Sequence, residues 1–113
     1  MHPFIARAFG LTQHLPGVTP GPYWNGEKEA LLVGGKALAH TCRYDDALAV
    51  HCPLAIKAML VEAAPDIYYD TPHFARWPAI LVRMAAIDDA TLATRLEAAW
   101  RDRAPKKLLR LHP

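Results

Sequence analysis

Residues 31–52 run LLVGGKALAHTCRYDDALAVHC, and this pattern predicts three consecutive β-strands. Gly34-Gly35 is a turn signal, because glycine readily adopts the positive φ angles of a two-residue hairpin loop. A second turn at Asp45-Asp46 separates the two longer strands, Lys36–Arg43 and Ala47–Cys52. Strands joined by turns this short pair antiparallel, so the middle of the chain predicts an antiparallel sheet.

The segments on either side predict three helices and two further strands. They are the helices Pro3–Leu15, Pro53–Ala64 and Asp88 to about Arg103, and the strands Ile67–Tyr69 and Ala79–Ala85. The order α-β-β-β-α-β-β-α indicates an α+β fold, a two-layer sandwich with helices packed on one face of an antiparallel sheet. Gly17–Gly26 contains three glycines and two prolines, so we expect no regular structure there.

Length and composition fit a single domain over residues 1–113. A hydrophobic content of 52% excludes a natively disordered chain. No apolar run approaches the roughly 20 residues of a membrane span, and residues 1–7 lack the pattern of a signal peptide. With only two cysteines, we expect a cytoplasmic protein without a membrane partner. The sequence leaves its oligomeric state open.

Histidine and cysteine residues around the second turn raise the question of a metal site. Pairing across Asp45-Asp46 would place His40 opposite His51, with Cys42 on the same face. Such side chains bind zinc or copper, but a one-residue shift in register separates them. The pattern alone therefore assigns no metal and no other cofactor. Cys42 and Cys52 are expected on opposite faces, without a disulfide between them.

No catalytic motif accompanies the six histidines. The chain contains no serine, and Gly34-Gly35 lacks the Gly-Lys-Thr pattern of a phosphate-binding loop. The aspartates fall at turns and helix starts, where capping explains them. We therefore expect a binding protein and not an enzyme.

Basic residues make nucleic acid the first expected partner. The net charge is only +2, but residues 101–110 contain five cations and one acid. The residues expected to contact phosphates are Lys36, Arg43, Arg76, Arg101, Arg103, Lys106 and Lys107. About five contacts to duplex DNA would make log affinity fall with log salt at a slope of roughly −4 to −5. The alternative is a solvated basic tail whose charge complements the dipole of the last helix.

Aromatic residues suggest a second function. Tyr23, Trp24, His73 and Trp77 form a candidate cleft that could stack a small planar ligand or a base. The alternative is that these rings fill the rim of the core. A third function is a protein-interaction module that uses the apolar surface around Leu54 or the exposed face of the sheet.

Several short strings, in their order and spacing, resemble one family of small bacterial proteins. They are Leu15–Thr19, Gly21–Trp24, Val33–Lys36, Thr71–Phe74, Trp77–Arg83, Ala98–Arg101 and Ala104–Leu108. Together they span nearly the whole chain and are similar to the MmcQ/YjbR family. One departure is the apolar helix start Pro53–Ile56, where relatives are expected to carry acidic residues.

The resemblance implies an α+β domain with an antiparallel sheet, likened to the frataxin-like fold. It also implies DNA binding, through a proposed double-wing arrangement of hairpins. The likeness to frataxin does not extend to iron, because Pro3–Leu15 contains no Asp or Glu. The leading expectation is therefore a small cytoplasmic protein that binds DNA weakly and largely through phosphates.

Overall fold

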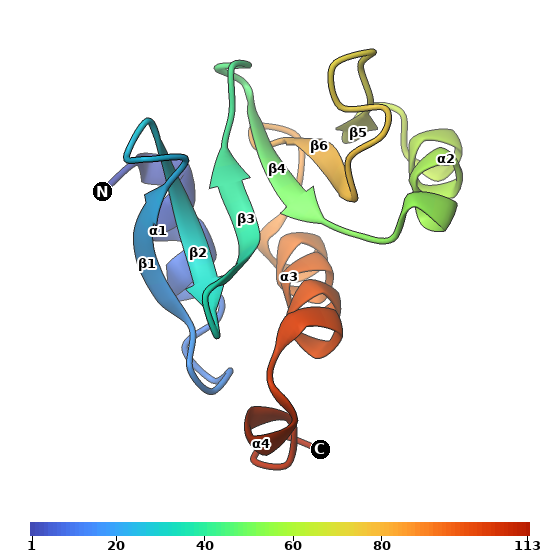
Figure 1. Cartoon of the computed structure of the whole chain (residues 1–113). Helices are drawn as coiled ribbons and strands as arrows, with labels where there is room; N and C mark the ends of the chain where they lie inside the picture. The colour runs from blue at the N-terminus through green and yellow to red at the C-terminus, as the bar shows by residue number, and fades with distance from the viewer.

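A computed structural model describes all 113 residues and contains one six-stranded antiparallel sheet (Figure 1). Its strands are β1 (Thr19–Tyr23), β2 (Lys28–Val33), β3 (Lys36–Thr41), β4 (Ala47–His51), β5 (Tyr68–Tyr69) and β6 (Ala79–Arg83). Its helices are α1 (Pro3–Gly10), α2 (Leu54–Ala63), α3 (Asp89–Arg103) and α4 (Lys106–Leu109). The strands lie in the order β1-β2-β3-β4-β6-β5. The predicted α+β fold class is confirmed.

Helices and large aliphatic side chains make one face of the sheet the main core. α1 packs against β2 and β3, and α3 packs against β3 and β4 (Figure 1). Leu38, Leu48 and Ile80 on the strands, with Leu96 and Trp100 on α3, are fully buried in this core. α2 joins the same core from the β5–β6 side through partly buried apolar residues. None of the four helices has both the length and the apolar character needed to cross a membrane.

Two local signals place elements where the sequence predicts them. Gly34 and Gly35 have φ angles of 56° and 80° and join β2 to β3. The Asp88 carboxylate accepts a hydrogen bond of 2.7 Å from the backbone N–H of Thr91 and caps α3. Glycine at positive φ and aspartate at an N-cap act through their immediate neighbours, so the sequence reveals them directly.

The register of the second hairpin differs from the expected one by two residues. His40 lies opposite Ala49, not opposite His51. The last paired residues of β3 and β4 are Thr41 and Leu48, so the connection between these strands is longer than a two-residue turn. The Cys42 thiol donates weak hydrogen bonds to carbonyl groups of this connection. A two-residue shift preserves the alternation of faces, so His40 and His51 still point to the same side.

The expectation of an irregular segment at Gly17–Gly26 is wrong for Thr19–Tyr23, which forms the edge strand β1. Pro20 and Pro22 are tolerated there because an edge strand has a neighbour on one side only, so alternate N–H groups need no partner in the sheet. The C-terminal tail also differs, since Lys106–Leu109 forms the short helix α4. Neither element has a strong local signal.

Candidate functional site

A loop, residues 70–78, packs on β4 and β6 on the sheet face that the helices leave free. Phe74 packs its ring on Ala47, Ala49 and Leu81, and the ring is almost completely buried. The side chains of the two alanines are small, and the space above them is occupied by the Phe74 ring. This face therefore has a second, smaller core whose cover is a loop and not a helix.

A buried lysine on α2 fixes this loop. Lys57 is 4% exposed, and its Nζ donates hydrogen bonds to the carbonyl oxygens of Phe74 (2.7 Å) and Trp77 (3.0 Å). It also forms an ion pair of 3.0 Å with the Asp70 carboxylate. A buried ammonium group is costly unless it is fully paired, so these three contacts fix the loop at both ends. They hold Phe74 inward and leave Trp77 at the surface.

Aromatic rings lie next to one another from the β1–β2 turn to this loop, some exposed and one buried, and we call this group the aromatic face. Its members are Tyr23, Trp24, His40, His73, Phe74 and Trp77. Ring centroids lie 4.9 Å apart for Tyr23 and His40, 6.3 Å for His40 and Phe74, and 6.1 Å for Trp24 and Trp77. All four residues predicted for a cleft are thus brought onto one surface.

The two exposed tryptophans come from two different connections between strands: Trp24 directly follows β1, and Trp77 lies two residues before β6. Trp24 is 54% exposed at the β1–β2 turn, and Trp77 is 47% exposed in the loop between β5 and β6. Trp24 also has a φ angle of 53°, in the left-handed region. A bulky residue in that region costs about 1–3 kcal/mol, and such strain concentrates at functional sites. Exposed apolar surface of this kind is typical of a binding site.

Two small hollows flank the tryptophans, and each is lined by a cation. One, of about 110 Å³, lies between Tyr23, Trp77 and Arg103, and we call it the Arg103 hollow. The other, of about 100 Å³, lies beside Trp24, Lys28 and Arg43, and we call it the Arg43 hollow. Sites for drug-sized ligands are typically about 300–1,000 Å³. Each hollow therefore suits a small anionic group, such as a phosphate or carboxylate.

His40 lies between the two hollows and lines both of them. Burial lowers the pKa of His40, and the charges of Lys28 and Arg103 lower it further, against the opposing effect of its hydrogen bond with the Thr41 carbonyl. The ring is therefore neutral at pH 7 and can stack without adding charge. Arg103 is oriented by a hydrogen bond of 2.9 Å to the Ala37 carbonyl oxygen.

The seven cations predicted to contact phosphates do not form one patch. Arg43 and Arg103 lie at the hollows, and Arg76 is exposed on the loop at residues 70–78. Lys36 begins β3, the opposite end of that strand from Arg43. Arg101 faces another surface, where its Nε lies 3.2 Å from the Glu97 carboxylate.

The remaining two, Lys106 and Lys107, are exposed on α4. They lie toward the same end of the sheet as Lys36, because Pro105 contacts the β2–β3 turn at Gly34. The basic residues thus divide between the aromatic face and the C-terminal end of the molecule, where Arg101 also contacts the carbonyl oxygen of His112.

The sequence does not place Lys28, His40 or Phe74 among the predicted residues of this site, and it indicates His40 only as a potential metal ligand. His40 could have been found from strand alternation, but its neighbour Tyr23 lies on the unpredicted strand β1. The side chains of His40, Cys42 and His51 share a face without converging on a point that one ion could occupy. Cys42 and Cys52 are free, as expected, and lie in different core clusters.

Leu54 and Met59 on α2 are more than half exposed. This apolar surface agrees with the exposure expected around Leu54. It is separate from the aromatic face, because neither residue lines either of its hollows.

Comparison with known proteins gives a family but no characterised relative. A family model described as YjbR matches residues 13–102. Over 54 residues the chain is 41% identical to the uncharacterized proteins Rv2570 of Mycobacterium tuberculosis and Mb2600 of Mycobacterium bovis. That segment is 48% of this chain and 42% of each relative, so less than half of their length is matched. No solved structure matches the chain.

Proposed function

The chain belongs to the YjbR family, and from that premise and the aromatic face we propose that it binds DNA weakly, without catalysis. The bound form is single-stranded, and its bases stack on Trp24 and Trp77. Its phosphates are held by the cations of the two hollows. The observation that carries this proposal is the pair of half-exposed tryptophans, 6.1 Å apart, with a cationic hollow on each side.

Stacking supplies the apolar part of this binding. Every base presents a flat face to an aromatic ring, and each stacked base contributes roughly 1–3 kcal/mol without strong sequence preference. Trp24 and Trp77 come from two separate connections between strands, which is the form that the proposed double-wing arrangement would take in this chain. A duplex hides the faces of its bases, so these exposed rings favour an unpaired strand.

Phosphate contacts supply the electrostatic part. Arg43 and Lys28 line one hollow, Arg103 lines the other, and Arg76 stands on the loop between His73 and Trp77. Four contacts to a single strand would give a slope of about −3 for log affinity against log salt. The binding should therefore be weak at physiological salt.

A small planar anion, such as a single nucleotide, is the second candidate for the same surface. Such a ligand would place its one ring between the tryptophans and its one phosphate in a hollow. The dependence on length separates the two candidates, because a strand that engages both hollows gains affinity with each added nucleotide until both are filled.

The test is a fluorescence-anisotropy titration with a labelled 12-nucleotide deoxythymidine strand. A labelled duplex of equal charge is titrated in parallel, and deoxythymidine monophosphate is added as a competitor. We expect micromolar binding of the strand at low salt, weaker binding of the duplex, and quenching of tryptophan emission. Trp77→Ala should weaken binding at least tenfold, while Met59→Ala, which removes another exposed apolar side chain from α2, should not.

The double variant Lys106→Glu/Lys107→Glu tests the other basic group. If it abolishes binding while Trp77→Ala has no effect, the C-terminal end and not the aromatic face is the binding surface. Absence of binding to either DNA at low salt would overturn the proposal. Competition by the monophosphate at the affinity of the full strand would instead favour the small-ligand function.

A further inference from the structure

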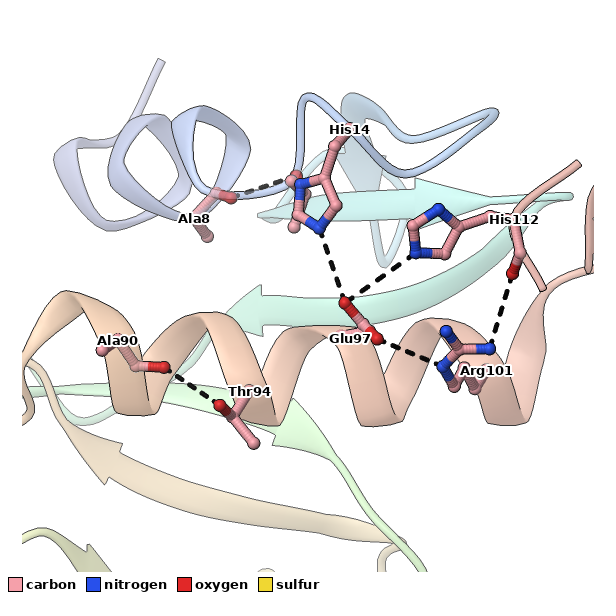
Figure 2. A network of polar contacts seen from close by, with 8 residues as sticks. Ala8, His14, Ala90, Thr94, Glu97, Arg101 and His112 are labelled. Carbon is pink, nitrogen blue, oxygen red and sulfur yellow. Dashed lines mark hydrogen bonds and ion pairs between the residues drawn. The ribbon is translucent and has the colours of Figure 1, made fainter.

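Three potential metal ligands converge on the side of α3 that faces away from the sheet (Figure 2). They are His14 from the segment after α1, Glu97 from the middle of α3, and His112 from the segment after α4. The Nε2 atoms of His14 and His112 lie 3.5 Å and 4.0 Å from the same oxygen, Oε1 of Glu97. All three ligand atoms lie within 4.8 Å of one another.

The fold holds the first of these segments in place through α3. The indole N–H of Trp100 donates a hydrogen bond of 2.9 Å to the carbonyl oxygen of Pro16. The Thr12 hydroxyl, which is buried, donates to the Ala8 carbonyl at 3.1 Å and closes the turn after α1. His14 lies between these two anchors, so its position beside Glu97 follows from the packing of the main core.

The C-terminal segment is held by two further contacts. Leu108 of α4 packs directly on Gly17, where an added Cβ would come within 2.5 Å of its Cδ1 atom. Trp100 also meets the His112 ring edge-on, at a centroid distance of 5.5 Å. Both contacts bring His112 to the same turn of α3 as Glu97.

Arg101 orients the carboxylate between the two imidazoles. Its Nε lies 3.2 Å from the other oxygen of Glu97, Oε2, so Oε1 is left to the histidines (Figure 2). The carboxylate is thus fixed by an outer partner, as metal-binding carboxylates are.

We propose that His14, Glu97 and His112 bind a divalent transition-metal ion of the zinc class. Two imidazoles and one carboxylate are a ligand set that zinc uses, with a fourth position left for water. Ligands about 2.0–2.1 Å from a tetrahedral ion are roughly 3.4 Å apart. The two histidine–carboxylate separations are 3.5 Å and 4.0 Å, and no pair of ligand atoms is more than 4.8 Å apart. Side-chain rotations that bring the ligand atoms closer together by up to about 1.4 Å therefore complete the site.

The site links three segments that are distant in the chain, so the ion stabilises the folded state. Binding to the native state alone raises stability with the logarithm of free ion concentration. At one hundred times the dissociation constant, the unfolding midpoint of a chain of this size rises by roughly 10 °C. The ion also fixes α4, which carries Lys106 and Lys107.

The experiment uses the whole chain, purified without a histidine tag. Zinc chloride is titrated by calorimetry, and thermal unfolding is followed with and without zinc. We expect one ion per chain, a higher midpoint, and at least tenfold weaker binding in His14→Ala and His112→Ala. His2→Ala removes a histidine that directly precedes α1, outside the cluster, and should bind as the wild type does.

Cobalt distinguishes this site from the cysteines. Co²⁺ bound by nitrogen and oxygen ligands gives weak visible bands without the intense near-ultraviolet band of a thiolate. Either a thiolate band, binding unchanged in both His14→Ala and His112→Ala, or no binding at millimolar zinc would overturn the proposal. Glu97→Gln keeps the shape of the side chain and should also weaken binding, which separates ligation from packing.

Discussion

On one face of the sheet, α1 and α3 bury leucine, isoleucine and tryptophan side chains completely. On the other face a loop packs on alanines, and Trp77 of this loop and Trp24 of the β1–β2 turn remain about half exposed. The first face is held by apolar area and close packing, which depend little on any single polar contact. The second is held by the buried Phe74 ring and by one lysine with its three oxygen partners. This difference indicates that the helix-covered face stabilises the domain, whereas the loop-covered face is available for binding.

Alanine residues on the strands explain why the second face is available for binding. Ala47, Ala49 and Ala79 leave room above the strands, and the Phe74 ring fills only part of it. The Arg103 hollow borders the same region, lined by Ala79 beside Trp77 and Tyr23. A face lined with leucines would have bound a helix more tightly and left no such hollow.

The largest expected effect is on the helical face. Trp100→Ala removes a fully buried ring and its hydrogen bond to Pro16. We expect a loss of about 3–5 kcal/mol in the free energy of unfolding, measured by urea denaturation. Trp77→Ala, on the other face, should cost less than about 1 kcal/mol. Equal losses of stability in the two variants would contradict the inference that the helical face contributes more to the stability of the domain than the other face.

The next effect is on the loop that covers the second face. Lys57→Met leaves two carbonyl groups and the Asp70 carboxylate without their partner. We expect a loss of roughly 2–4 kcal/mol, with amide exchange accelerated most at residues 71–78. Lys36→Met at an exposed position is the control and should change stability by less than about 0.5 kcal/mol. Uniformly accelerated exchange in Lys57→Met would show that the lysine supports the whole fold and not the loop.

A smaller effect on stability should accompany a large effect on binding at Trp24. Asparagine adopts positive φ angles more readily than tryptophan, so Trp24→Asn should leave the stability unchanged or raise it by up to about 1 kcal/mol. Affinity for the deoxythymidine strand should fall at least tenfold, because a stacking surface is lost. A stability loss above 2 kcal/mol would mean that Trp24 belongs to the core.

The smallest effect concerns pH. Burial, with the charges of Lys28 and Arg103, lowers the pKa of His40 in the folded state. Neutral His40 therefore contributes stability that is fully present above the unfolded-state pKa of about 6.5 and is lost as pH falls through the folded-state value. His40→Gln should flatten the stability profile below pH 6.5 in urea titrations. An unchanged profile would place the acid sensitivity elsewhere.

Parts of this fold follow from local chemistry, and the sequence predicts them correctly. Gly34-Gly35 and the Asp88 cap each act through neighbours in the chain. β1 could not be predicted in this way, since its prolines are acceptable only at a sheet edge. The shifted register of β3 and β4 likewise depends on the connection between them.

The sequence by itself determined which residues could form a site, namely the aromatic cluster and the cations, and the α+β class that carries them. Only the tertiary structure decided that Trp24 meets Trp77 and that Arg43 and Arg103 lie beside this pair. It also decided that His14, Glu97 and His112 converge. The physical reason is range: turns and caps depend on nearby residues, whereas these contacts join segments that only packing of the sheet and helices brings together.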